Sequence, residues 1–192
     1  MQLHFPGEPK EKRAYSIASS PLERTAIEIT FAVAGKFTAR LFDSKPGDAL
    51  SIEGPYGRWT YAGDAPHAVV VTGGTGIAPV RSMARLVIDQ RLPNRLSIFY
   101  SSKTEEEVVY RSELEQWAKH PNIDVHATLT RGKWTGPTGR LDLQTIAAAV
   151  GDLQRPVYYL CGPNALVEAI FRALLDANVP RERIHREKWG EF

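Results

Sequence analysis

Cysteine is nearly absent from this sequence of 192 residues, since it occurs once, at Cys161. A single thiol cannot form an intrachain disulfide, a four-thiolate zinc site or a four-thiolate iron–sulfur cluster, so any one-electron centre must reside elsewhere. The sequence also lacks an apolar run of the roughly 18 residues that a membrane-spanning helix needs, and its first residues do not read as a leader peptide. These absences predict a soluble, cytoplasmic protein with no metal site and no membrane partner.

The sequence also has little excess of charge of either sign. Lysine and arginine number 24 and aspartate and glutamate 22, an excess of two that provides no basic stripe for nucleic-acid phosphates. We therefore expect no nucleic-acid partner. The apolar fraction of 43% and charged fraction of 24% are those of an ordinary globular protein. The length suits two small domains, because compact domains usually have about 100–150 residues.

The first third of the chain has the alternation of a half-buried strand. Apolar side chains occupy every second position of one segment: Ile27, Ile29, Phe31 and Val33. This period of two is typical of a strand with one buried face. Turn signals that combine proline and glycine recur at residues 5–7, 45–48 and 54–57. Because the composition shifts after this region, we predict an antiparallel β domain over residues 1–64.

Beyond residue 66, short apolar runs alternate with helical patterns. The apolar runs, interpreted as strands, cover residues 68–71, 96–100, 123–129 and 157–160. Helical spacing of apolar residues follows each run, over residues 80–87, 105–117, 143–150 and 167–175. This alternation predicts a parallel sheet with helices on both faces, in a doubly wound domain over residues 67–192.

A glycine-rich turn between the first of these strands and its helix gives the strongest signal. It consists of Thr72, Gly73, Gly74, Thr75 and Gly76. Glycines allow the backbone to approach a pyrophosphate closely, and the N-terminus of the following helix presents unpaired N–H groups to it. A proline stands where the dinucleotide fingerprint has its third glycine, so a tight structural turn is the alternative.

Arg13, Tyr15 and Ser16 form a second motif, inside the predicted β domain. A guanidinium suits a phosphate, and the aromatic ring offers a flat face. Taken alone, an exposed arginine and a packed tyrosine would explain the motif equally well. The motif becomes informative because further segments follow it in a fixed order along the chain: residues 35–38, 54–57, 72–79 and 161–163.

This succession of motifs resembles the ferredoxin–NADP reductase superfamily over essentially the whole chain. In that family an antiparallel barrel binds FAD, and a following Rossmann-like parallel sheet flanked by helices binds a nicotinamide dinucleotide. The resemblance implies that Arg13 binds the FAD pyrophosphate, that Tyr15 lies against the isoalloxazine and that Ser16 lies near flavin N5. It further implies that main-chain N–H groups complete the pyrophosphate site, at Gly35, Lys36, Phe37 and Thr38.

The resemblance also implies where the nicotinamide lies. The glycine turn would hold the NAD(P) pyrophosphate, and the segment beside the nicotinamide would be Cys161, Gly162 and Pro163. Three side chains are implied near the reacting atoms: Ser16, Cys161 and Glu187. For Cys161, a buried thiol that merely packs in the core is the alternative.

Two further segments are assigned by the same resemblance. The interdomain cleft would be shaped by Gly54, Pro55 and Gly57. Near the end of the chain, Trp189 would cover the flavin ring, or else simply complete a core.

The choice of coenzyme depends on charge near the ribose 2′ position. An acidic residue after the second strand favours a 2′-hydroxyl, whereas a basic side chain can meet a 2′-phosphate. Here Ser102 and Lys103 end that strand. Arg131, after the third strand, resembles an arginine that binds the phosphate in NADPH-using relatives. We favour NADPH, and NADH stays open because these cations could be solvated surface charges.

The chain departs from the family in having only residues 1–12 before the Arg-x-Tyr-Ser motif, so the barrel is expected to be incomplete. A missing N-terminal piece, a strand donated by a partner or second copy, or a reduced form of closure would each account for this. The expected activity is hydride transfer from NAD(P)H to FAD, then electron transfer to a separate acceptor such as a ferredoxin or oxygenase component. Alternatives are a flavin reductase that uses free flavin and a non-catalytic electron-transfer component of a complex.

Overall fold

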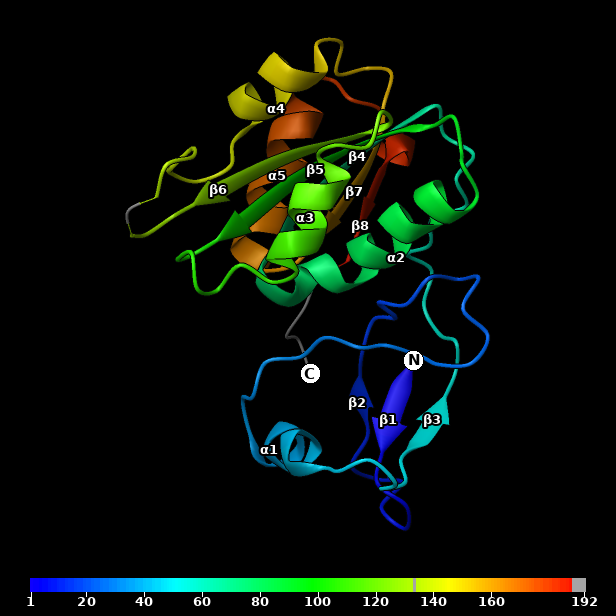
Figure 1. Ribbon diagram of the computed structural model, residues 1–192. Coiled ribbons are helices and arrows are strands. Elements are labelled where there is room, and N and C mark those ends of the chain that lie inside the picture. Colours follow the sequence, from blue (N-terminus) through cyan, green and yellow to red (C-terminus); the bar gives the residue numbers. More distant parts are fainter. Residues whose placement is uncertain (133, 188–192) are drawn as a thin grey trace.

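The computed structural model describes residues 1–132 and 134–187, which form two lobes (Figure 1). The β lobe contains a three-stranded antiparallel sheet in the order β2-β1-β3 and one helix. Its elements are β1 (Gln2–His4), β2 (Arg13–Ala14), α1 (Lys36–Asp43) and β3 (Ser51–Glu53). The helix buries Phe37 and Leu41 against Leu3 and Phe5, and these four side chains form the core of the lobe. The predicted antiparallel sheet is confirmed, and no strand ladder among the described residues closes it into a barrel.

The predicted strand over residues 27–33 is wrong. This segment belongs to no strand, and Ile27 and Val33 are both more than half exposed. Only Ile29 and Phe31 pack against the core of the β lobe. The Ala18 N–H donates to the Glu28 carbonyl at 2.8 Å, but the described residues show no ladder of such bonds along this segment, so the alternation in the sequence is not converted into a sheet.

The α/β lobe has a five-stranded parallel sheet in the order β6-β5-β4-β7-β8. Its strands are β4 (His67–Gly73), β5 (Arg95–Ser102), β6 (Ile123–Leu129), β7 (Val157–Cys161) and β8 (Ile184–Arg186). Its helices are α2 (Ile77–Asp89), α3 (Arg111–Trp117), α4 (Leu143–Val150) and α5 (Asn164–Asp176), with short 3-10 turns η1 (Gly74–Gly76) and η2 (Arg181–Arg183). The predicted doubly wound sheet is confirmed.

Helices cover both faces of this sheet. One buried cluster joins β4 and β5 to α2 and α3, and a second joins the opposite face to α4 and α5. Local chemistry sets the helix ends: the Asp142 carboxylate accepts the Thr145 N–H at 2.8 Å and so caps α4. The predicted helix over residues 105–117 begins only at Arg111, because Tyr110 adopts a left-handed conformation with φ of 58°.

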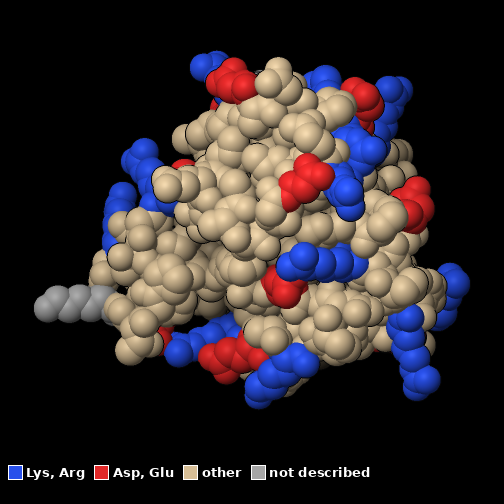
Figure 2. All heavy atoms as spheres, turned by 90° about the horizontal axis from the view of Figure 1, so that it is seen from above, with Lys and Arg blue, Asp and Glu red and all other residues tan. Residues whose placement is uncertain are grey.

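The surface shows no broad area of one charge on the face drawn in Figure 2, where acidic and basic side chains are interspersed. This agrees with the near balance of charges in the sequence. No helix in the described part of the chain is long and apolar enough to cross a membrane.

Candidate functional site

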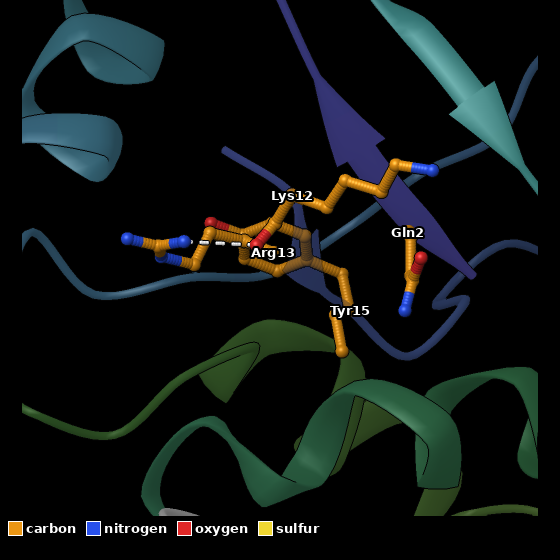
Figure 3. A pocket seen from close by; sticks show the side chains of 5 residues that line it. Gln2, Lys12, Arg13 and Tyr15 are labelled. Carbon is orange, nitrogen blue, oxygen red and sulfur yellow. Dashed lines mark hydrogen bonds between the residues drawn. The ribbon is translucent and has the colours of Figure 1, made fainter. Parts of the chain in front are cut away.

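The Arg13 side chain lines a pocket at the end of β2 that faces the α/β lobe (Figures 1 and 3). The pocket has a volume of about 250 Å³ and is lined by Gln2, Lys12, Arg13, Ala14 and Tyr15. Arg13 Nη1 donates a hydrogen bond to the Lys12 carbonyl at 2.8 Å. Arg13 forms no ion pair within residues 1–132 and 134–187, so its charge is free to meet an anion.

Tyr15 provides a flat aromatic face beside Arg13. Its ring stacks on Phe37 at 6.4 Å between centroids and stands edge-on to Phe31 at 6.2 Å. Burial raises the pKa of the Tyr15 phenol, although the nearby Arg13 charge opposes this effect. The phenol is therefore neutral at physiological pH, which suits contact with a planar ring.

The first turn of α1 packs against two residues that line this pocket, Arg13 and Tyr15. Phe37, in that turn, lies under the Arg13 guanidinium at 5.6 Å. Gly35 precedes the helix and no side chain caps the start, while the Thr38 hydroxyl accepts the Ala34 N–H at 2.8 Å. The first N–H groups of a helix have no intrahelical acceptors and attract anions. Arg13 and the start of α1, where Lys36 is exposed, thus converge in a way that fits a pyrophosphate.

The turn after β3 lies next to this region. A Cβ added to Gly54, whose φ is 138°, would lie 3.2 Å from Met1 Cα. The Met1 carbonyl accepts the Tyr15 N–H at 2.9 Å, so the turn and Tyr15 share a neighbour. Pro55 and Gly57 are exposed, and Ser16 is half-buried.

The glycine turn and the segment Cys161–Pro163 pack directly against each other. They end two neighbouring strands, in which Thr72 pairs in register with Cys161. A Cβ on Gly76 would lie 2.9 Å from Gly162 Cα, and one on Gly162 would lie 3.0 Å from Gly73 N. Only glycines permit so close an approach of two backbones. Above the turn, a Cβ on Gly74 would meet nothing within 4 Å, which leaves open space at the N-terminal end of α2.

The Cys161 thiol is fully buried beneath this turn. Its Sγ lies 3.3 Å from the Gly76 carbonyl and 3.5 Å from Thr72 Oγ1. Burial, with a smaller contribution from the Glu187 carboxylate, raises its pKa to about 12. A thiol with this pKa stays protonated, so it can support the turn but is not a nucleophile at neutral pH. The Glu187 N–H donates to the carbonyl of Leu160, the residue before Cys161, at 2.9 Å.

The predicted ribose-phosphate contacts lie together at the carboxyl ends of β5 and β6. The Ser102 carbonyl accepts the Thr130 N–H at 2.9 Å, and the Lys103 carbonyl accepts the Arg131 N–H at 2.8 Å. Ser102 is buried, whereas Lys103 is exposed and lies 3.8 Å from the Glu107 carboxylate. Arg131 makes no ion pair with any described residue and is exposed. Trp189, the remaining predicted contact, lies outside the described residues.

The connection between the lobes was not anticipated from the sequence. Trp59 and Tyr61, which follow β3, stand edge-on to Tyr159 at 5.5 and 5.6 Å and so attach the linker to the α/β lobe. Arg81 of α2 reaches back to the β lobe. A signal for Arg81 was present, because it falls within the apolar face of a helix, four residues after the buried Ile77.

Comparisons with known proteins identify a family model that matches each of the two lobes. Residues 70–172 match the family model described as an oxidoreductase NAD-binding domain, and residues 1–61 match an oxidoreductase FAD-binding domain. The chain belongs to the ferredoxin–NADP reductase superfamily. A superfamily relative, ferredoxin–NADP reductase B of Sorangium cellulosum, is 33% identical over 201 residues, which cover 97% of this chain and 81% of that protein.

Other relatives are longer than this chain. One component of the Na(+)-translocating NADH-quinone reductase of Pseudomonas paraeruginosa is 29% identical over 93% of this chain and 48% of that protein. The chain thus spans about half the length of the first known relatives it matches. A ferredoxin–NADP+ reductase of Neisseria gonorrhoeae, solved with bound FAD and NADP, shares the fold with a TM-score of 0.79 and 20% identity, over 97% of this chain and 84% of that one.

Among the described residues, no group of three or more histidine, cysteine, aspartate or glutamate side chains could hold a metal ion. The residues present fit the two organic cofactors of the superfamily. Arg13 and the start of α1 provide charge and N–H groups for FAD, and the open space above Gly74 provides room for the dinucleotide.

Proposed function

We propose that this chain transfers a hydride from NAD(P)H to FAD and passes the electrons to a separate acceptor protein. Residues 1–64 would hold FAD and residues 67–192 the dinucleotide. The observation that carries this proposal is the convergence of Arg13, Tyr15 and the first turn of α1 at one pocket on the side of the β lobe that faces the α/β lobe.

The residues of the chain would bind and orient rather than perform acid–base chemistry. Arg13 and the N-terminus of α1 would neutralise the pyrophosphate of FAD. The glycine turn and the N-terminus of α2 would hold the pyrophosphate of the nicotinamide dinucleotide. Tyr15 holds a planar ring by its face, and Ser16 donates a hydrogen bond near it. Cys161 keeps its proton and supports Gly76, while Lys103 and Arg131 favour NADPH over NADH. When bound, the nicotinamide supplies a hydride and the flavin accepts it.

A direct experiment combines the purified chain with stoichiometric FAD under anaerobic conditions and adds NADPH or NADH. We expect the yellow flavin absorbance to disappear rapidly, and faster with NADPH. FAD and NADPH without protein provide the control. If the flavin stays oxidised with both coenzymes, the proposal is wrong, and a non-catalytic role within a complex becomes the better explanation.

A flavin reductase that releases its flavin is a second candidate, favoured by the small volume of the pocket. Its volume of about 250 Å³ falls below the roughly 300–1,000 Å³ typical of sites that enclose a ligand. Dialysis of the FAD-loaded protein distinguishes the two: tightly retained flavin supports the reductase with an acceptor protein, and complete loss with sustained turnover of added flavin supports the alternative.

The edges of the β-lobe sheet, at β2 and β3, would be paired by further polypeptide, either more chain, a partner or a second copy. Light scattering of the pure chain across a concentration series tests the second copy, because a mass that stays at that of one chain at every concentration excludes pairing between copies.

A further inference from the structure

Arg81, in the second turn of α2, contacts both lobes with one buried guanidinium. Its side chain is only 8% exposed. Its Nε donates to both carboxylate oxygens of Glu113 in α3, each at 2.9 Å. Its Nη1 donates to the Ala18 carbonyl at 3.1 Å and to the Glu28 carboxylate, both in the β lobe. A single side chain therefore links α2, α3 and the segment that follows the flavin-side Tyr15.

Neighbouring groups reinforce this contact. The Arg81 guanidinium lies 4.6 Å from the centre of the Tyr110 ring, and the Tyr110 hydroxyl hydrogen-bonds to Thr30 of the β lobe. Tyr110 has φ of 58°, a conformation that a bulky residue adopts only where its surroundings compensate for the strain. Arg85, one turn further along α2, belongs to the same cluster, since it lies 3.4 Å from Glu28 and 3.7 Å from Glu113, but it is four times as exposed as Arg81, at 32% against 8%.

The location of this cluster connects it with the chemistry. Arg81 lies five residues after Gly76 on the helix whose N-terminus faces the open space above the glycine turn. Ala18 lies three residues after Tyr15. We propose that Arg81 is a positioning residue that fixes the orientation of the two lobes and, through it, the alignment of the Tyr15 pocket with the glycine turn. This inference rests on the proposed hydride transfer, in which the two bound rings must meet at about 3–3.5 Å.

The chemistry of the side chain explains why an arginine occupies this position. A guanidinium has five N–H donors in one plane, which can serve Glu113, Glu28 and the Ala18 carbonyl together. A lysine ammonium keeps the charge but is a compact point donor on a flexible stem, so it cannot maintain the same geometry. Removal of the β-lobe carboxylate of Glu28 leaves the Arg81–Glu113 pair in place but weakens the link between the lobes.

The test compares Arg81→Lys and Glu28→Gln with the matched control Arg95→Lys, because the ion pair of Arg95 with Asp124 lies within the α/β lobe. Glu28→Gln keeps the Arg81–Glu113 pair within the α/β lobe and retains a folded variant if Arg81→Lys fails to fold. We expect both test variants to reduce bound flavin about 10²-fold more slowly in single turnover, the effect of a misplacement of about 1 Å. Their affinities for FAD and NADPH should stay unchanged, and the control should behave like the wild type.

A second measurement does not depend on cofactors. Hydrogen exchange of the cofactor-free protein should show loss of amide protection in residues 18–30 in both test variants and not in the control. Unchanged flavin reduction in both variants overturns the proposal, as does weaker cofactor binding with an unchanged rate. If even the wild type fails to reduce flavin, the proposed function is wrong, and protection of residues 18–30 then decides the role of Arg81 alone.

Discussion

Alanine substitutions at Gly74 and Gly76, two glycines of the same turn, should impair two different properties of the protein. Gly74 has φ of 54°, in the left-handed region, and an added Cβ meets nothing within 4 Å. Gly76 has an ordinary helical φ of −59°, but an added Cβ would lie 2.6 Å from Thr72 Oγ1 and 2.9 Å from Gly162 Cα. We therefore expect Gly74→Ala to impair dinucleotide binding and Gly76→Ala to impair folding.

The magnitudes follow from these two environments. Gly74→Ala costs about 1 kcal/mol of stability, the strain of a left-handed alanine. Its new methyl group occupies the space expected for the pyrophosphate, so we expect the dissociation constant for NADPH to rise at least about tenfold, or roughly 1.4 kcal/mol. Gly76→Ala forces two backbones apart, and overpacking of this kind costs about 1–3 kcal/mol.

Urea unfolding with and without NADPH measures both effects. At a concentration of NADPH equal to about 100 times the wild-type dissociation constant, the ligand should stabilise the wild type by about 2.7 kcal/mol and Gly74→Ala by at most about 1.4 kcal/mol. Equal stabilisation of the two would show that the turn does not hold the dinucleotide. A Gly76→Ala variant as stable as the wild type would refute the close packing of the two turns.

Three further outcomes are expected. Arg13→Ala should raise the dissociation constant for FAD about 10–100-fold in a fluorescence titration, because a hydrogen bond to a charged group contributes about 1.5–3 kcal/mol, whereas Lys10→Ala should not. Because burial raises the pKa of Cys161 to about 12, the unfolded chain loses this proton first as pH rises. The free energy of unfolding should then fall above about pH 8.5, by at most about 1.4 kcal/mol per pH unit, and Cys161→Ala should flatten this fall in urea titrations between about pH 8.5 and 10. Arg131→Ala should reduce the preference for NADPH over NADH about tenfold in steady-state kinetics, a loss of roughly 1.4 kcal/mol, and Arg140→Ala should leave it unchanged.

The parallel sheet was predictable from the sequence because its central strands, β4, β5 and β7, are buried on both faces. Such strands form continuous apolar runs, as at residues 68–71, and short connections to the following helices leave few alternative topologies. The packing of the glycine turn against Gly162 was not predicted, since it depends on the strand order, which places β7 beside β4. Residues 27–33 show the limit of this reasoning: alternation reports which side chains prefer burial, but a strand also needs a partner for its backbone hydrogen bonds.

The contacts between the lobes depend on tertiary structure in a way that no local pattern records. Glu28, Arg81 and Glu113 are far apart along the chain, and the helical spacing that places Arg81 on an apolar face does not identify its partners. A buried guanidinium must find acceptors for its donors because desolvation of an unpaired charge is costly, and only the fold shows which acceptors these are. The partners that it finds, Glu28 and the Ala18 carbonyl, belong to the other lobe. The hydrogen bonds that the buried Arg81 needs therefore also restrict how the two proposed cofactor surfaces can face each other. The stability of the contact between the lobes is thereby coupled to the geometry of the proposed reaction.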